Sequence, residues 1–147
     1  MPSVDLHDVN LKIVADLQSQ ADIKAIIGDP VRVYIHTPRE AKYPWCRMEN
    51  LAGGMLTGSR NGAGPPDWIY EHVMQFSIFE NTADLTNVAE AMRLISDRME
   101  AAPDNITGTF PEWTITHSLP GARSASYDSV NRHAMAFCVF TFHLEGT

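Results

Sequence analysis

Six histidines are the side chains of this chain best suited to chemistry, because a neutral imidazole binds transition metals and exchanges protons near pH 7. No two of them stand two or four residues apart, the spacings that direct two imidazoles at one ion. Three fall in β-prone segments and could meet across adjacent strands, in a register that the sequence leaves open. We interpret the histidines as ordinary strand and surface residues and expect no metal site. The six are His7, His36, His72, His117, His133 and His143, and those at 72, 117 and 143 are the β-prone three.

The cysteines and the paired carboxylates are equally poor candidates for catalysis. Cys46 and Cys138 lie in apolar, strand-like segments, whereas a nucleophilic thiol needs exposure and a lowered pKa. We interpret both as reduced core residues in a cytosolic setting. The carboxylate pairs stand at helical spacing on polar faces, which a solvated helix surface explains. These pairs are Asp5 with Asp8 and Asp97 with Glu100.

The glycine-rich segment 53–64 does not form a phosphate-binding loop, because it lacks the lysine and the following helix that such a loop requires. With no activated nucleophile, acid–base pair or phosphate loop, we expect no enzyme and no cofactor. A histidine-based metal enzyme and a small-ligand module with the glycine-rich segment as a lid are the remote alternatives.

Size and charge exclude other classes. The 147 residues fit one domain, residues 1–147. The net charge is −7 and the 11 Lys and Arg residues are dispersed, so we expect no direct grip on nucleic acid. An acidic protein can still surround DNA that passes through it. No apolar segment is long enough for a membrane helix and the first residues do not read as a secretory leader, so we expect no membrane contact.

Hydrophobic periodicity predicts an α+β fold, with a mainly antiparallel β-sheet of about five strands flanked by helices in the order α-α-β-β-β-α-β-β. Asp5 or Asp8 caps the first helix, and Ser19 with Asp22 caps the second, which ends at Gly28. Asn81 caps the third helix, which Pro103 closes. The expected strands cover 31–36, 43–51, 68–80, 110–119 and 134–144, and the long loops cover 52–67 and 120–131.

The last strand is apolar on both of its alternating faces. Met135, Phe137 and Val139 share one face, and Phe140 and Phe142 share the other. Helices in a protein of this size cover only one face of a sheet, so we expect a neighbouring subunit to cover the second. We therefore expect assembly rather than catalysis.

The two predicted loops are long enough to favour a role in binding. Together with two strand positions and one tryptophan, they supply the residue types that are common at protein interfaces. The candidate interface residues are Met55, Leu56 and Arg60 in the first loop, Trp68 beside it, Arg123 and Tyr127 in the second loop, and Phe140 and Phe142 in the last strand.

The order of these segments resembles the tail-completion and tail-terminator proteins of long-tailed bacteriophages and gene transfer agents. The resemblance covers most of the chain and rests on spacing rather than on any catalytic motif. The segments that carry it are Ala21–Asp29 leading into Val31–Tyr34, Tyr43–Trp45, Val73–Phe79, Asn81–Met99 and Arg132–Leu144.

This resemblance implies a structural protein without catalysis, which forms a six-membered ring on the head-proximal end of the tail tube. The ring stops tube polymerisation and joins the tail to the head connector. The implied partners are further copies of the chain, the major tail tube protein and the head-closure or connector protein, while DNA passes through the lumen unbound. The protein would be assembled in the host cytoplasm and reside in the virion tail. A head-closure or neck ring protein is the alternative.

Overall fold

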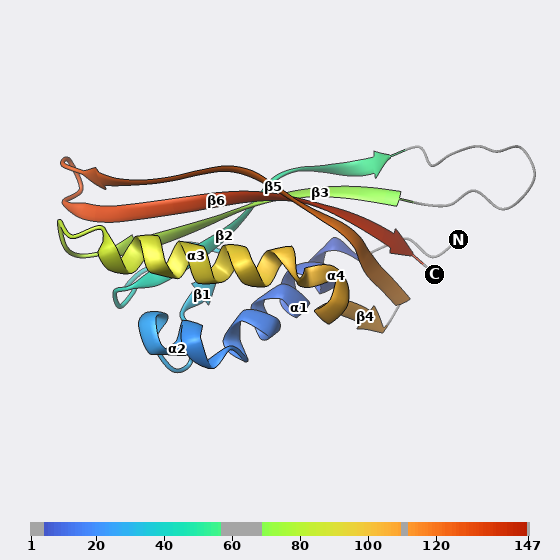
Figure 1. Ribbon diagram of the computed structural model, residues 1–147, viewed down its shortest axis with the longest axis horizontal. Helices are drawn as coiled ribbons and strands as arrows, with labels where there is room; N and C mark the ends of the chain where they lie inside the picture. The colour runs from blue at the N-terminus through green and yellow to red at the C-terminus, as the bar shows by residue number, and fades with distance from the viewer. Residues whose placement is uncertain (1–4, 57–68, 110–111, 147) are drawn as a thin grey trace, which may run out of the picture.

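The computed structural model describes residues 5–56, 69–109 and 112–146 of the protein. Four helices and six strands follow one another along these residues (Figure 1). In chain order they are α1 (Leu6–Gln18), α2 (Ala21–Ile27), β1 (Val33–Tyr34), β2 (Trp45–Leu56), β3 (Ile69–Glu80), α3 (Thr86–Glu100), α4 (Ala102–Asn105), β4 (Thr107–Thr109), β5 (Glu112–Asp128) and β6 (His133–Gly146).

The strands form one six-stranded sheet in the order β1-β2-β3-β6-β5-β4. Strand β1 is parallel to β2, and the other neighbours are antiparallel. The helices lie together on one side of this sheet (Figure 1). The α+β prediction and its order of elements are confirmed, with the short α4 and β4 added between α3 and β5.

Local sequence sets the ends of the first two helices. The Asp5 carboxylate accepts a hydrogen bond from the backbone N–H two residues on, at 3.0 Å, which confirms it as the cap of α1. Gly28 ends α2 with φ 104°, a conformation that glycine adopts without strain. The expected cap at Ser19 is wrong, because its hydroxyl donates to the Asp16 carbonyl at 2.6 Å and Gln20 takes the cap position.

Helix α3 begins at Thr86, five residues after the cap predicted at Asn81. The Asp84 carboxylate accepts hydrogen bonds from the Thr86 backbone N–H and hydroxyl, at 2.9 and 2.6 Å, and so stabilises this later start. The helix buries a stripe that includes Val88 and Ile95 against the sheet.

Strand β5 is the largest departure from the prediction. The loop expected from Pro120 to about Asn131 is wrong, since β5 continues to Asp128 and only a tight turn precedes β6. Its glycine, proline and small polar residues predicted a loop. An edge strand tolerates them because it donates hydrogen bonds to one neighbour only. Register shifts at 115/117 and 120/123 accommodate the irregular residues. The first expected loop, residues 52–67, is also wrong at its start, since residues 52–56 belong to β2, and its residues 57–67 lie outside the described residues.

The core lies between the sheet and the helices. The even-numbered residues of β6 from Ala134 to Leu144 are all 0–2% exposed and pack beneath α3 and α1. The odd-numbered residues of the same strand face the opposite side and are only partly buried. The strand therefore alternates in burial although it does not alternate in polarity, because helices cover one side alone.

Candidate functional site: the uncovered face of the sheet

The outer face is the side of the sheet that bears no helix among the described residues. Residues paired directly across antiparallel strands share a face, so the register defines its members. They include Trp45, Arg47, Glu49 and Ala52 of β2; Glu71, Val73, Gln75, Ser77 and Phe79 of β3; His133, Met135, Phe137, Val139, Thr141, His143 and Glu145 of β6; and Thr114, His117, Leu119, Ser124, Ser126 and Asp128 of β5.

One end of the outer face covers itself with aromatic rings. Trp45 and Phe79 stack with centroids 4.6 Å apart, and each is 8% exposed. His133 meets Phe79 edge-on at 5.2 Å, and the Arg47 guanidinium lies 5.8 Å from the same ring. This end is therefore packed within the single chain.

The middle of the outer face has no such cover. Met135, Phe137 and Val139 of β6 are partly exposed, and Leu119 on the neighbouring β5 is 46% exposed. They form an apolar strip between polar residues of the same face. Partly exposed apolar side chains in contiguous rows are typical of protein contact surfaces. Among the described residues, this strip is the surface best suited to contact another protein chain.

Two of the three β-prone histidines meet, as the sequence allowed. His117 and His143 are paired across β5 and β6 on the outer face, with ring centroids 5.8 Å apart. His72 lies on the opposite face, 1% exposed, where its Nε2 is 3.1 Å from the Asn10 Oδ1 of α1. Burial lowers the pKa of His72, so the neutral ring is favoured in the core. Within the described part of the chain, no cluster of three or more His, Cys, Asp or Glu residues could hold a metal ion.

The predicted interface residues are scattered by the fold. Arg123 and Tyr127 lie exposed on β5, the latter 43% exposed, rather than in a loop. Phe140 and Phe142 are 1% and 0% exposed and lie in the core beneath the helices. Met55 and Leu56 belong to the end of β2, whereas Arg60 and Trp68 fall outside the described residues. The outer-face residues of β6 were visible in the sequence as the second apolar face of the last strand.

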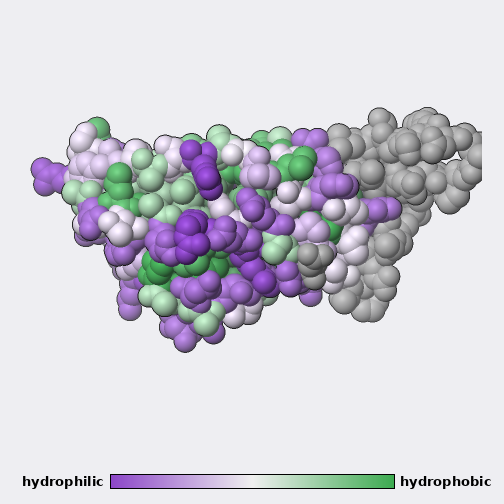
Figure 2. Space-filling view, in the orientation of Figure 1, coloured by the Kyte–Doolittle hydropathy of each residue, from purple (hydrophilic) through white to green (hydrophobic). Residues whose placement is uncertain are grey.

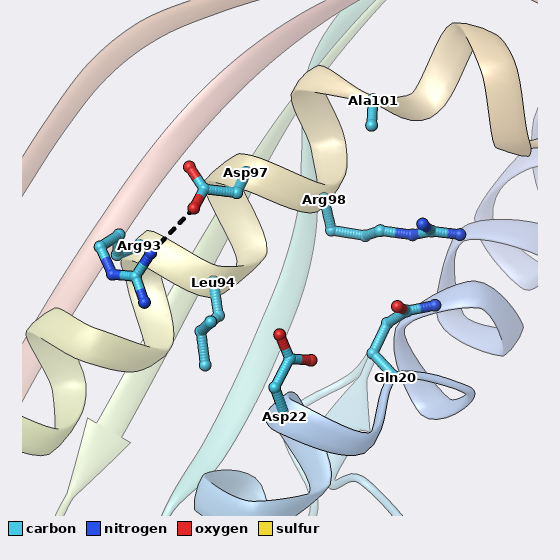
Figure 3. A pocket seen from close by; sticks show the side chains of 7 residues that line it. All are labelled: Gln20, Asp22, Arg93, Leu94, Asp97, Arg98 and Ala101. Carbon is cyan, nitrogen blue, oxygen red and sulfur yellow. Dashed lines mark hydrogen bonds and ion pairs between the residues drawn. The ribbon is translucent and has the colours of Figure 1, made fainter.

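A groove between α2 and α3 is the second feature of the surface, with a volume of about 380 Å³ (Figure 3). Figure 2 shows hydrophilic side chains along both helices and a narrow hydrophobic band between them. Arg93 is bonded to Glu90 and to Asp97, the latter at 3.0 Å. Arg98 forms two hydrogen bonds with Asp16 of α1, at 2.8 and 2.6 Å, which raise the pKa of its guanidinium. Since both cations are already paired, the groove is a helix-packing feature rather than an anion site.

The cysteines are core residues, as expected. Cys46 and Cys138 are free thiols, 0% and 2% exposed. Burial raises the pKa of Cys138 to about 11 and raises that of Cys46 as well, which keeps both thiols protonated near neutral pH. No helix in the described residues is long and apolar enough to span a membrane.

Comparison with known proteins identifies the fold. No family of protein sequences matches the chain, and no curated protein matches it either. A solved structure described as the virion of a native gene transfer agent (GTA) particle contains a chain with the same fold, at a TM-score of 0.69. The two sequences are 14% identical, and the match covers 99% of this chain and 100% of that chain. The present chain therefore has, from end to end, the fold of a chain in that virion.

Proposed function

We propose that this protein is a tail terminator, a structural ring protein that caps the head-proximal end of a phage-like tail tube. The ring stops polymerisation of the tube and joins it to the head connector. The observation that carries the proposal is the end-to-end match to a chain of a gene transfer agent virion, with 99% and 100% of the two chains covered. A match that covers nearly all of both chains supports a similar place in a similar particle.

The outer face supports a role in assembly. Its middle exposes Phe137, Val139 and Leu119, which no helix of the described chain covers. Burying such residues against another chain of the particle yields free energy, at roughly 25 cal/mol per Å² of apolar surface. We propose that a neighbouring chain of the tail covers this face, and that several copies of the protein, six by resemblance, form the ring.

The charge of the protein suits a passage for DNA. The net charge is −7, and the arginines of α3 are paired with carboxylates. A surface of this kind repels phosphates and favours the movement of DNA through a lumen over adhesion to its wall. The proposed site of action is the virion tail, after assembly in the host cytoplasm.

Deleting the gene from its source genome and measuring tail lengths by electron microscopy tests the proposal. The expected result is overlong, headless tubes, with normal length restored by the gene supplied in trans. Tails of normal length beside heads that leak DNA would assign the protein to the neck, on the head side of the joint. Normal infectious particles would refute a structural role altogether.

A further inference from the structure

Among the residues that the structure describes, both edges of the sheet are largely unpaired. On one side, β1 pairs only with Cys46 and Arg47, so no strand among the described residues pairs with β2 from Met48 onward. On the other side, β4 pairs only with Glu112–Thr114 at the start of β5. The rest of β5, residues 115–128, forms an outer edge. Open edges present unsatisfied backbone N–H and C=O groups, which readily pair with another strand.

The open parts of the two edges lie at the same height in the sheet. Following the paired residues from strand to strand, Met48 of β2 is level with Arg123 of β5. Gly53 of β2 is level with Ser118 of β5 in the same way. Beyond one end of this interval β1 pairs with β2 at Cys46 and Arg47, and beyond the other end β4 pairs with β5 at Glu112–Thr114. Between these paired ends, residues 48–53 of β2 and 118–123 of β5 both lie at an edge without a strand partner among the described residues.

Strand directions allow these edges to join. The strands β2, β3, β6 and β5 alternate in direction, so β2 and β5 run opposite ways. A second copy placed beside the first in the same orientation therefore presents its β2 antiparallel to the first copy's β5. The antiparallel sheet then continues from copy to copy, and such head-to-tail contacts close into a ring when the rotation allows.

Each open edge carries an exposed leucine at the same level of the sheet. Leu51 sits at the register shift in β2 and is 50% exposed, at the height of the 46% exposed Leu119 on β5. The charged residues of the two intervals do not add to this match, because Glu49 lies on the outer face, paired with Arg47 at 3.3 Å, whereas Arg123 is opposite Cys138 on the helix-covered face. A cavity of about 260 Å³ lies beside Gly121 and Arg123 and leaves room for a neighbour's side chain.

We propose that copies of this chain join edge to edge, with the open edge of β2 in one copy pairing antiparallel with the open edge of β5 in the next. This inference rests on the proposed ring and names its subunit contact. Leu51 of one copy packs near Leu119 of the next. Because the sheet continues through this contact, the outer faces of all copies stay free for another component of the tail.

Crosslinking of two single-cysteine variants tests the pairing. Leu51→Cys and Leu119→Cys chains, carrying different tags, are co-expressed and treated with a bismaleimide that spans about three residues of strand, ~10 Å. Crosslinked dimers that contain both tags are expected, with none from wild-type protein, whose own cysteines are buried. Crosslinks within either variant expressed alone would show like edges pairing and would overturn the proposal. Rings that form without crosslinks between unlike chains would overturn it too.

A charge substitution supplies an independent readout, with a control of matched exposure. Leu51→Asp is expected to raise the concentration at which the protein assembles about tenfold or more, because it puts a charge into the contact. Leu11→Asp changes a residue of helix α1, outside the sheet, that is 47% exposed, so it should leave assembly unchanged. Equal effects from the two variants would overturn the edge contact. The tail-length test judges the terminator function separately.

Discussion

Phe137 and Phe140 are three residues apart on β6, and the fold gives them opposite roles. Phe140 is 1% exposed beneath the helices, with Phe142 stacked at 6.0 Å and Phe76 edge-on at 6.5 Å. Phe140→Ala should therefore cost about 3–5 kcal/mol of the free energy of unfolding. A domain of this size has about 5–15 kcal/mol in total, so the variant should lose a large share of its stability.

Phe137 lies on the outer face, where its partners across the strands are Ser77 and Ser124. Complete burial of such a side chain yields about 1.5–3 kcal/mol, and partial burial about half of that, so Phe137→Ala should cost the isolated chain ~1 kcal/mol. Phe137→Asp should likewise fold, because its carboxylate remains in water. If the outer face contacts another tail protein, Phe137→Asp should nevertheless fail to restore tail length in the deletion strain.

Urea unfolding of the dissociated chain measures the two costs, and electron microscopy of the complemented deletion strain measures function. Folded Phe137→Asp protein that restores normal tails would refute the assignment of the outer face as a contact surface. Equal unfolding costs for Phe137→Ala and Phe140→Ala would show that the outer face is already covered within one chain. Phe140→Asp should yield no soluble folded protein, because the core cannot hydrate its charge.

Two further predictions concern the helix side of the sheet. Burial lowers the pKa of His72 below its ordinary value of 6.5, so the unfolded chain binds a proton there that the folded chain excludes. The free energy of unfolding is therefore complete above pH 6.5 and falls as the pH decreases, by up to ~1.4 kcal/mol per pH unit, until the pH reaches the pKa of the folded state. His72→Gln should flatten this pH dependence, as measured by urea unfolding between pH 7.5 and 5.5. His36→Gln, at an exposed position, should not flatten it. Arg98→Gln should lower the free energy of unfolding, measured in urea, by about 1–3 kcal/mol, because it leaves the largely buried Asp16 carboxylate without its two charged hydrogen bonds. Arg93→Gln, at an exposed position, should change it little. Equal losses in the two variants would refute the distinction between the buried and the exposed ion pair.

Some features of the fold were predictable from the sequence because they depend on local rules. Asp5 and Gly28 mark the ends of the first two helices through capping and backbone conformation, and the structure confirms both. The start of α3 was predicted wrongly at Asn81, since Asp84 and Thr86, three and five residues later, form a second capping motif. Where two caps compete, packing against the sheet decides between them.

Strand β5 shows why the rest could not be predicted. Its residues 120–124 read as a loop by composition, yet they form an edge strand because β6 supplies hydrogen bonds on one side. The pairing of His117 with His143 depends on the register shift at 115/117, which has no local signature. The same holds for the bonds that link Asp16 on α1 to Arg98 on α3, 82 residues away.

The sequence by itself determined that the last strand is apolar on both sides, which led to the prediction that another chain covers the side that the helices leave open. The sequence could not determine which side of the strand the helices cover, because the side chains on both sides are apolar and no local motif distinguishes them. Tertiary structure decided this by packing α1 and α3 on the row of Phe140 and Phe142, leaving the row of Phe137 and Val139 partly exposed. The physical reason is that pairing across strands fixes each face as a unit, so one choice of helix packing settles the burial of every residue on both faces.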